Sequence, residues 1–401
     1  MDLPISTPLS EITPRIAHLQ ASLNQMGLDG AMILQNTDLF YFSGTIQQGH
    51  LYIPAEGEPV FMVHKNFERA RMESPLGTLI KLDSPKSVMD LIQKNGLKPP
   101  TIMGMELDVM PASTYFYYKK IFPHVEIQDI SGPIRKIRAI KSAYEVDLIR
   151  KAAALSDEVT EMMPSLLKVG MTEVDLAGRV EAEARRRGHQ GLVRMRMWGA
   201  EMFYGHLMAG PSAAVPSCIP SPTGGPSVSP AVAQGPGFRK IQPGDLVLLD
   251  YVFAWKGYLA DSTRIFSLGE PSPEMVAAHT AILEMQARLK PMGKPGALAG
   301  DLYQEAMAFA SQRGISENFM GAGENRVRFI GHGVGLELDE LPVIAQGQRM
   351  ALEAGMTIAL EPKMIFPDVG VVGIENTHLV TPDGFEQLTH AEESIVCVPA
   401  G

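Results

Sequence analysis

The chain has 401 residues, of which 45% are hydrophobic and 20% charged, and its formal net charge is −10. This length suits two or three domains with a sizeable core and excludes a disordered chain, while the acidic balance argues against nucleic acid or an anionic membrane as a partner. Two cysteines, Cys218 and Cys397, exclude a disulfide-stabilised scaffold. No secretory signal or membrane-spanning apolar run is visible, so a cytoplasmic protein is expected.

Helix and strand alternate in the N-terminal part of the chain. Residues 15–26 carry apolar side chains at helical spacing up to Gly27, which predicts a helix that ends there. Short apolar runs predict strands at 30–34, at 52–53 and 59–63 as a hairpin, at 101–103 and near 125–127. This alternation predicts an α/β domain, which we place at residues 1–135.

A basic segment, IRKIRAIKS at 134–142, follows this domain. It could contact nucleic acid, but no aromatic side chains are interleaved and the rest of the chain is acidic. A solvated linker leading into a helix is the favoured interpretation, and we assign residues 136–401 to a second domain. Helices are predicted there over 143–167 and 173–187.

The second domain contains an internal repeat. When the chain is shifted by 126 residues, residues 168–188 fall on 294–314 with several identities and no gap, and His206 falls on His332. This pattern predicts two halves related by duplication. A site between the halves is expected, because neither half can close that surface alone.

Proline and glycine are concentrated in one segment of this domain. Residues 209–237 hold seven prolines and five glycines. Such a composition excludes a helix and disfavours a central strand. A loop of this length is either functional, as a wall or lid over a site, or an inert surface linker.

Two predicted hairpins carry carboxylates inside apolar strands. Asp250 lies in the outgoing strand of the first hairpin and Asp261 in its return, and a loop at 254–257 would place them directly opposite each other. Like charges that face each other in a buried hairpin are costly unless a cation lies between them. A surface edge strand would be the structural alternative.

The second hairpin is expected to turn at 367–370. Glu361 and Glu375 are symmetric about Asp368 and would also face each other, although a bulge near Pro362 could shift this register by one. Two such hairpins are difficult to explain as structure alone. Four converging carboxylates predict a site for divalent cations, and two metal ions would balance their charge.

His332 is the best candidate for a nitrogen ligand to the same ions. It lies in FIGHGVG, where flanking glycines let other groups approach closely, and it is near the second hairpin in sequence. A lone histidine is otherwise more often a satisfied core residue. Together with the four carboxylates, His332 predicts a di-metal hydrolase site.

These motifs resemble those of the pita-bread metallopeptidases, the family of Xaa-Pro aminopeptidase, prolidase and methionine aminopeptidase, with creatinase as a relative. The resemblance rests on Asp250 and Asp261 at their spacing, GHGVG around His332, LEP around Glu361 and GIENT around Glu375. The segments DGAMI and LFYFSG resemble the creatinase/prolidase N-terminal domain. The resemblance implies an α/β N-terminal domain and an α+β pita-bread catalytic domain with an internal pseudo-twofold repeat.

The resemblance also implies roles for these five residues. They would bind two divalent metal ions, for which manganese, cobalt, iron and zinc are the candidates. Asp250, Glu361 and Glu375 would include the bridging ligands. Glu361 would be the general base for a water that attacks the scissile carbonyl. Short peptides are the implied substrates, and a homodimer is the implied assembly.

Three positions depart from the family pattern on the substrate side. Proline-specific members usually have histidines where this chain has Ser217 and Asp339, and commonly an arginine where it has Gly373. His206, which the repeat places opposite His332, could replace a lost histidine or be a structural strand residue. Asp339 could accept a substrate amine or hydroxyl, or it could be a plain loop acid.

Three functions follow from these observations. The leading one is di-metal-dependent hydrolysis of short peptides, as an Xaa-Pro dipeptidase or aminopeptidase. Glu361, His206 and Asp339 would be its catalytic residues, and Ser217, His206 and Asp339 would contact the substrate. A creatinase-like hydrolase or lyase acting on a small non-peptide substrate is the alternative that the lost histidines favour. A binding module derived from a decayed peptidase is the third, and the intact ligand pattern weighs against it.

Overall fold

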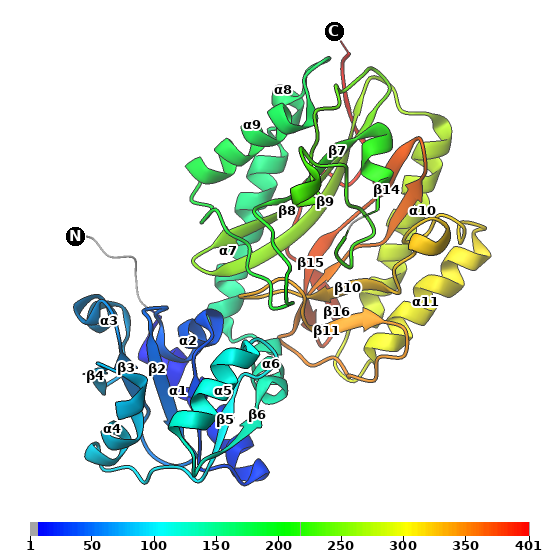
Figure 1. The fold of residues 1–401 in the computed structure, drawn as a ribbon. Helices are drawn as coiled ribbons and strands as arrows, with labels where there is room; N and C mark the ends of the chain where they lie inside the picture. The colour runs from blue at the N-terminus through cyan, green and yellow to red at the C-terminus, as the bar shows by residue number, and fades with distance from the viewer. Residues whose placement is uncertain (1–6, 217, 401) are drawn as a thin grey trace. The chain divides into compact units, whose positions relative to one another are not determined.

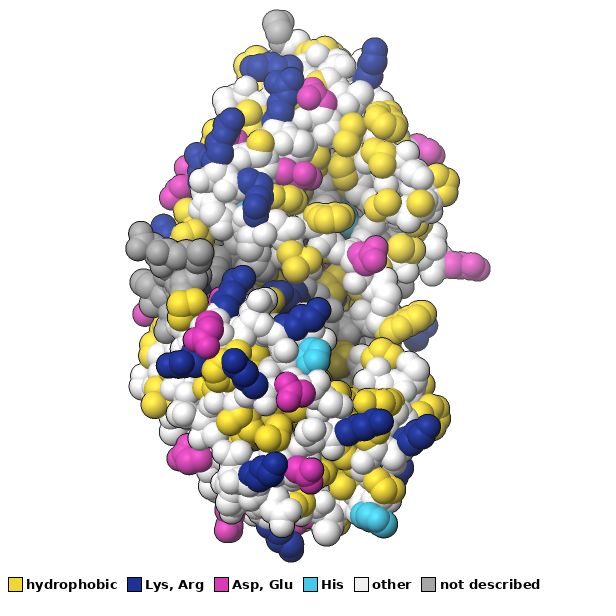
Figure 2. Space-filling view, turned by 60° about the vertical axis from the view of Figure 1, so that its left-hand side comes forward, with side chains coloured by type: hydrophobic (Ala, Val, Ile, Leu, Met, Phe, Trp, Pro, Cys, Tyr) yellow, Lys and Arg dark blue, Asp and Glu magenta, His cyan; other side chains and the backbone are white. Residues whose placement is uncertain are grey.

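A computed structural model describes residues 7–216 and 218–400. The chain divides into two compact units, Met1–Arg138 and Ala139–Gly401. The boundary expected after residue 135 falls inside a helix, α6 (Ser131–Ala139). None of the described helices is long and apolar enough to cross a membrane. On the face drawn in Figure 2, basic side chains are interspersed with acidic and hydrophobic ones.

The first unit is built around a mixed six-stranded sheet in the order β4-β3-β2-β1-β5-β6, with helices packed around it (Figure 1). Its strands are β1 (Gly30–Ile33), β2 (Gly49–Pro54), β3 (Val60–Val63), β4 (Leu79–Lys81), β5 (Ile102–Met105) and β6 (Glu126–Asp129). Its helices are α1 (Leu9–Met26), α2 (Asn36–Ser43), α3 (Phe67–Glu73), the 3₁₀ turn η1 (Pro85–Ser87), α4 (Val88–Lys94), α5 (Ala112–Ile121) and α6. The expected hairpin is β2–β3, and β1 pairs antiparallel with β2 and parallel with β5.

The basic segment at 134–142 is not a solvated linker, because most of it belongs to α6. The guanidinium of Arg138 is buried, with Nη1 2.7 Å from Asp38 Oδ1 in the same unit. The ammonium of Lys141 is also buried, with Nζ 3.0 Å from Glu340 Oε2 in the second unit. These two charges are therefore committed to internal ion pairs and not to a surface patch.

The second unit contains three sheets, in the orders β17-β9-β8-β7, β11-β10-β12-β15-β16 and β13-β14. Its strands are β7 (Gly205–Ala209), β8 (Leu246–Trp255), β9 (Tyr258–Leu268), β10 (Phe329–Gly333), β11 (Glu340–Ala345), β12 (Thr357–Leu360), β13 (Lys363–Phe366), β14 (Gly370–Gly373), β15 (Asn376–Thr381), β16 (Gly384–Gln387) and β17 (Val396–Val398). Its helices are α7 (Ala143–Thr160), α8 (Met163–Leu166), α9 (Glu173–Arg186), α10 (Pro273–Leu289) and α11 (Ala299–Gln312), with 3₁₀ turns η2 (Gly210–Ala214), η3 (Pro230–Val232), η4 (Lys290–Met292) and η5 (Gly323–Asn325).

The helix expected over 143–167 is two helices. α7 begins at a capping box in which Ser142 and Glu145 satisfy each other's backbone N–H groups. It ends at Thr160, and α8 restarts with Pro164 in its first turn. Proline is tolerated there but not in a helix interior, so Pro164 explains why one continuous helix does not form.

The internal repeat is present in the structure. α9 and α11 begin and end at positions that differ by 126 residues, the offset found in the sequence. Leu176 on α9 packs in a core with Leu207 and Leu249, and Leu302 on α11 packs in a second core with Ile330. The order β7-β8-β9 in one half corresponds to β10-β12-β15 in the other, each pair antiparallel. The predicted duplication of a helix-and-strand half is confirmed.

Candidate metal centre

The first carboxylate hairpin is formed by β8 and β9, with a register that differs from the expected one. The turn is the two-residue segment Lys256–Gly257, with φ of 48° and 92°. Positive φ at both central residues gives a turn whose twist matches the two strands. Asp250 therefore pairs with Thr263, and Asp261 pairs with Val252. The prediction that the two aspartates lie directly opposite each other is wrong by two residues, which leaves both on the same face.

The second hairpin has the expected register but is divided between two sheets. Lys363 pairs with Gly373 on one side of the division and Leu360 with Asn376 on the other, in a single continuous register. Glu361 and Glu375 lie at the point where the hairpin passes from one sheet to the other. They face each other, as their symmetry about Asp368 predicts. Among the described pairs of this hairpin, no bulge shifts the register near Pro362.

Because the hairpin divides here, the backbones of both glutamates form hydrogen bonds with two neighbouring strands of the site, β10 and β9. The backbone N–H of Glu361 donates to Ile330 O of β10, at 2.9 Å. The backbone carbonyl of Glu375 accepts from Thr263 N–H of β9, at 3.2 Å. Pro362 has no N–H to continue the ladder, which favours the break at this point. Each glutamate is thereby fixed against a strand that carries another expected ligand.

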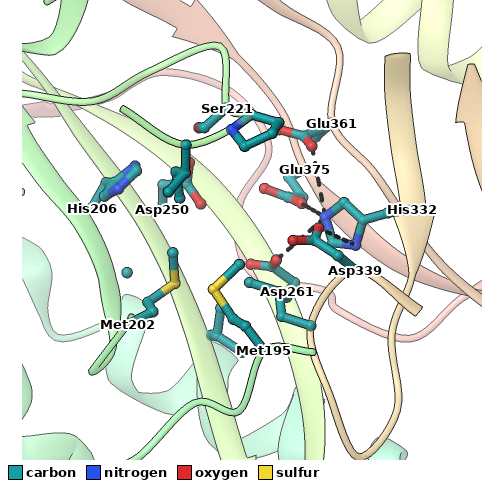
Figure 3. A pocket seen from close by; sticks show the side chains of 15 residues that line it. Met195, Met202, His206, Ser221, Asp250, Asp261, His332, Asp339, Glu361 and Glu375 are labelled. Carbon is teal, nitrogen blue, oxygen red and sulfur yellow. Dashed lines mark ion pairs between the residues drawn. The ribbon is translucent and has the colours of Figure 1, made fainter. Parts of the chain in front are cut away.

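All five expected ligands line one pocket (Figure 3). Figure 3 shows Asp261, His332, Glu361 and Glu375 directed toward one another, with Asp250 and His206 on the other side of the pocket. The remaining lining residues are Met195, Met202, Gly205, Ile219, Pro220, Ser221, Val252, Leu338 and Asp339. The pocket thus joins strands of both halves of the repeat, as the duplication predicts.

The ring of His332 is oriented with Nε2 toward the carboxylates. Nδ1 lies 3.1 Å from Gly333 O and must carry the ring proton to donate to this carbonyl. The neutral ring then has its lone pair on Nε2, which can bind a metal ion. Nε2 lies 3.6 Å from Glu361 Oε1 and 3.9 Å from both Asp261 Oδ2 and Glu375 Oε1. These distances are too long for hydrogen bonds, so the acceptors surround a space without bonding across it.

The residues around this space fit a divalent ion. Ligand atoms of Asp261, His332 and Glu375 lie within 4.8 Å of one another, and all three side chains are buried. Asp261 Oδ1 and Glu375 Oε1 have no hydrogen-bond partner among the described residues. A buried carboxylate oxygen without a partner is costly, and a bound cation would satisfy it. One imidazole with carboxylates is a donor set for transition-metal ions.

Packing these carboxylates together shifts their ionisation. Burial, reinforced by the charges of Glu375 and Asp250, raises the pKa of Asp261 well above its ordinary value. Burial also raises the pKa of Glu375 to about 7, and the Lys363 ammonium opposes that shift. Such shifts arise when like charges share a desolvated site that has too little positive charge.

Lys363 also belongs to this site, although it is not among the residues that the sequence predicts. Its Nζ lies 2.8 Å from Glu361 Oε2, 3.1 Å from Glu375 Oε2 and 3.2 Å from Asp250 Oδ2, and the side chain is fully buried. Burial alone would lower the pKa of Lys363, but the three carboxylates raise it well above its ordinary value. Strand alternation could have revealed it, because residues 361 and 363 lie on one face of an extended segment.

The expected substrate-side residues have different positions. His206 is buried on β7 opposite Asp250, and its ring nitrogens lie 3.3 Å from Thr223 Oγ1 and 3.2 Å from Gln234 Oε1. Burial lowers the pKa of His206. Asp339 has a left-handed backbone with φ of 62°, is partly exposed, and places Oδ1 3.7 Å from His332 Nδ1. Ser217 lies outside the described residues.

Two irregular segments complete the pocket wall. The loop at 209–237 contributes Ile219, Pro220 and Ser221, so part of this loop is a wall of the pocket. Met195 and Met202, from the segment before β7, were not anticipated. Met195 is held there by a bridge to Leu338, a long-range contact that leaves no local pattern in the sequence.

Comparison with known proteins agrees with this geometry. A model of metallopeptidase family M24 matches residues 147–382, and a model of the creatinase/prolidase N-terminal domain matches residues 15–140. The chain belongs to metallopeptidase family M24. The resemblance found in the sequence is therefore confirmed, and with it a metal-dependent peptidase family related to prolidases.

Relatives match this M24 chain over nearly its full length. It is 27% identical over 386 residues to an Xaa-Pro dipeptidase of Pyrococcus furiosus, a match that covers 95% of this chain and 99% of the relative. An Xaa-Pro dipeptidase structure from Bacillus anthracis matches with a TM-score of 0.82 at 23% identity, covering 96% of this chain and 100% of that one. Dipeptidase PepE from Mycobacterium ulcerans matches with a TM-score of 0.79 at 25% identity, covering 98% and 100%. The expected two-domain pita-bread fold is confirmed.

Proposed function

We propose that this protein is a metal-dependent peptidase that cleaves short peptides with proline in the second position. The observation that carries the proposal is the arrangement of Asp261, Glu361 and Glu375 around the lone-pair nitrogen of His332 in an M24 chain. The two buried oxygens without a partner support a cation at this point.

Asp261, His332, Glu361 and Glu375 are the proposed holders of a divalent ion, with Asp250 beside them. Such an ion, when bound, lowers the pKa of water and polarises a carbonyl group. Mn²⁺, Co²⁺, Fe²⁺ and Zn²⁺ all suit this donor set. Glu361 is the proposed general base, because its Oε1 faces the space in front of His332 and can take a proton from water there.

The pocket wall supports recognition of the amino end of a peptide. Apolar side chains of Met195, Met202 and Leu338 can contact a small side chain or a proline ring. Asp339 offers a partly exposed carboxylate that can bind a substrate ammonium. Lysine and arginine are absent from the described lining residues, so a substrate carboxylate finds no fixed cation there. This favours aminopeptidase action on peptides over strict dipeptidase action.

The test is a peptide panel on metal-depleted protein reloaded separately with each of the four ions. Ala-Pro, Ala-Pro-Ala, Ala-Ala and N-acetyl-Ala-Pro-Ala distinguish proline dependence, length dependence and the need for a free amine. We expect release of Ala from Ala-Pro-Ala that EDTA abolishes, and a loss of about 10²–10⁴-fold in Glu361→Gln. The exposed Glu324→Gln variant is the matched control. No turnover of any peptide with any ion would contradict the proposal.

A second candidate function is hydrolysis or elimination on a small non-peptide substrate. It is favoured by Asp339, by Gly373 and by the Lys363 ammonium among the carboxylates. The same preparations tested on small amides and guanidino compounds, with every peptide inert, would decide for it. A homodimer and a cytoplasmic location stay predictions from the sequence.

A further inference from the structure

A site in which metal ions supply all of the positive charge does not explain the buried ammonium of Lys363. Its Nζ donates hydrogen bonds to Glu361 Oε2 at 2.8 Å and Glu375 Oε2 at 3.1 Å, and it lies 3.2 Å from Asp250 Oδ2. All three are among the five residues expected to bind two metal ions. The ammonium therefore occupies a position at which three of the expected metal-binding carboxylates converge.

Two features of the second hairpin hold the ammonium there. Lys363 begins β13 directly after Pro362, and its cross-strand partner is Gly373. A Cβ built on Gly373 would lie 2.7 Å from Lys363 Cγ and 2.8 Å from both Lys363 Cα and Pro362 O, so the glycine leaves room for the lysine side chain and for the backbone beside it. The lysine at position 363 therefore depends on a residue without a side chain at position 373.

The glutamates divide their oxygens between two cationic positions. Oε2 of Glu361 and Oε2 of Glu375 both contact Lys363, and Thr263 Oγ1 also donates to Glu375 Oε2 at 2.8 Å. The other oxygens, Oε1 of each, face His332 Nε2. Carboxylates that bridge two metal ions share their oxygens in this way. Here one of the two positions already contains a covalently attached positive charge.

We infer that Lys363 replaces one of the two divalent ions. This chain then binds a single metal ion, in the space enclosed by Asp261, His332 and the Oε1 atoms of Glu361 and Glu375. The inference rests on the proposed metal-dependent function and specifies its metal content. Lys363 donates hydrogen bonds to Glu361 and Glu375, lies 3.2 Å from Asp250 Oδ2 and is not among the residues that line the pocket, so its role in this inference is to neutralise charge. One ammonium and one divalent ion leave one negative charge on the four carboxylates, which suits a substrate that carries an ammonium.

The test counts metal ions per chain. Full-length protein is saturated with Mn²⁺, passed through a desalting column and measured by elemental analysis, and binding is titrated by calorimetry. We expect one ion in the wild type and two in Lys363→Ala, in which Asp250 and the Oε2 atoms are released. Lys168→Ala, which removes an exposed lysine of the same unit, is the matched control and keeps one ion.

A second readout needs no variant and so does not depend on whether Lys363→Ala folds. Electron paramagnetic resonance of the Mn²⁺-loaded wild type should show an isolated ion without the exchange coupling of a bridged pair. Two tightly bound, coupled ions in the wild type would overturn the inference, as would a single ion in a folded Lys363→Ala. Failure of the proposed function has a different result, namely one bound ion with no peptide cleaved.

Discussion

Lys363 and Gly373 face each other across the β13–β14 hairpin, and the lysine stem crosses the space where a glycine side chain is missing. The ammonium that this pair directs inward is the buried positive charge closest to Asp250, Glu361 and Glu375 among the ion pairs of the described residues. This relationship links a change in the usual family sequence at position 373 to the charge of the candidate metal centre.

The first prediction concerns this pair. Gly373→Ala should destabilise the protein by about 1–3 kcal/mol, because the added methyl group overlaps the Lys363 stem and Pro362 O. In a Lys363→Ala background the cost should be smaller, since part of the overlap has been removed. Urea denaturation of the wild type, both single variants and the double variant measures this coupling. Additive effects would contradict the proposed contact.

Metal binding should depend on His332. We expect His332→Ala to lose the rise in unfolding free energy that saturating metal gives to the wild type, about 4 kcal/mol at a thousandfold excess over Kd. The exposed His390→Ala in the same unit should keep that rise. Thermal unfolding with and without Mn²⁺, each with an EDTA control, measures the difference. A metal-dependent shift of wild-type size in His332→Ala would show that the ion binds elsewhere.

Thr263 is predicted to position Glu375, not to bind metal itself. Its hydroxyl donates to Glu375 Oε2 at 2.8 Å, so Thr263→Val should let that carboxylate rotate and weaken Mn²⁺ binding about 10–100-fold. Calorimetric titration gives the Kd directly. Thr280→Val removes an exposed hydroxyl that bonds only its own helix, and it should leave the Kd unchanged. Equal Kd values in the two variants would refute the positioning role.

Asp339 is predicted to bind the substrate amine. Asp339→Asn keeps a residue that tolerates the left-handed backbone at φ 62° but removes the charge. We expect KM for Ala-Pro-Ala to rise about tenfold, which corresponds to roughly 1.4 kcal/mol, with little change in kcat. An unchanged KM, or a loss confined to kcat, would assign Asp339 another role.

His189 should make the protein sensitive to mild acid. Its Nε2 contacts Val252 O at 3.0 Å and its Nδ1 accepts from Gly191 N–H at 2.9 Å, so the neutral ring is fixed by the backbone. Burial lowers the pKa of His189 to about 4. Between about pH 6.5 and pH 4 the unfolded chain binds the additional proton, so the free energy of unfolding falls as pH falls.

The measurement for His189 is urea denaturation of metal-free protein at several pH values from 7.5 to 4. His189→Gln can keep one donor and one acceptor but cannot titrate, so its free energy of unfolding should vary less with pH. The difference between the two curves isolates this histidine from the carboxylates of the site. Parallel curves would contradict the assignment.

The sequence predicted the second hairpin better than the first, for a physical reason. Glu361 and Glu375 are related by a turn centred on Asp368, so counting outward from the turn places them opposite each other. For Asp250 and Asp261 the sequence predicts a loop at 254–257. The structure instead has a two-residue turn, in which Lys256 adopts a left-handed conformation that few lysines adopt. Because the register differs by two residues, both aspartates still lie on one face of the sheet, and the prediction that they share a site is unaffected.

Other parts of the site depend on the pairing of strands and on contacts between segments distant in the sequence. The position of the Lys363 ammonium depends on Gly373, a neighbour that only the pairing of the two strands identifies. Met195 and Met202 reach the pocket from an irregular segment through contacts distant in sequence. The repeat, by contrast, follows from a constant offset of 126 residues, and His332 is predicted from its flanking glycines and its nearness to the second hairpin; the structure places His332 in the pocket.

The most direct test of the metal centre is anomalous diffraction from crystals of the Mn²⁺-loaded wild-type protein. The account predicts one manganese peak, enclosed by Asp261, His332, Glu361 and Glu375, with the Lys363 ammonium in density between Asp250 and the two glutamates. No peak at His332 would contradict the metal-dependent function. A second peak beside Asp250, with Lys363 displaced, would contradict the replacement of a metal ion by Lys363.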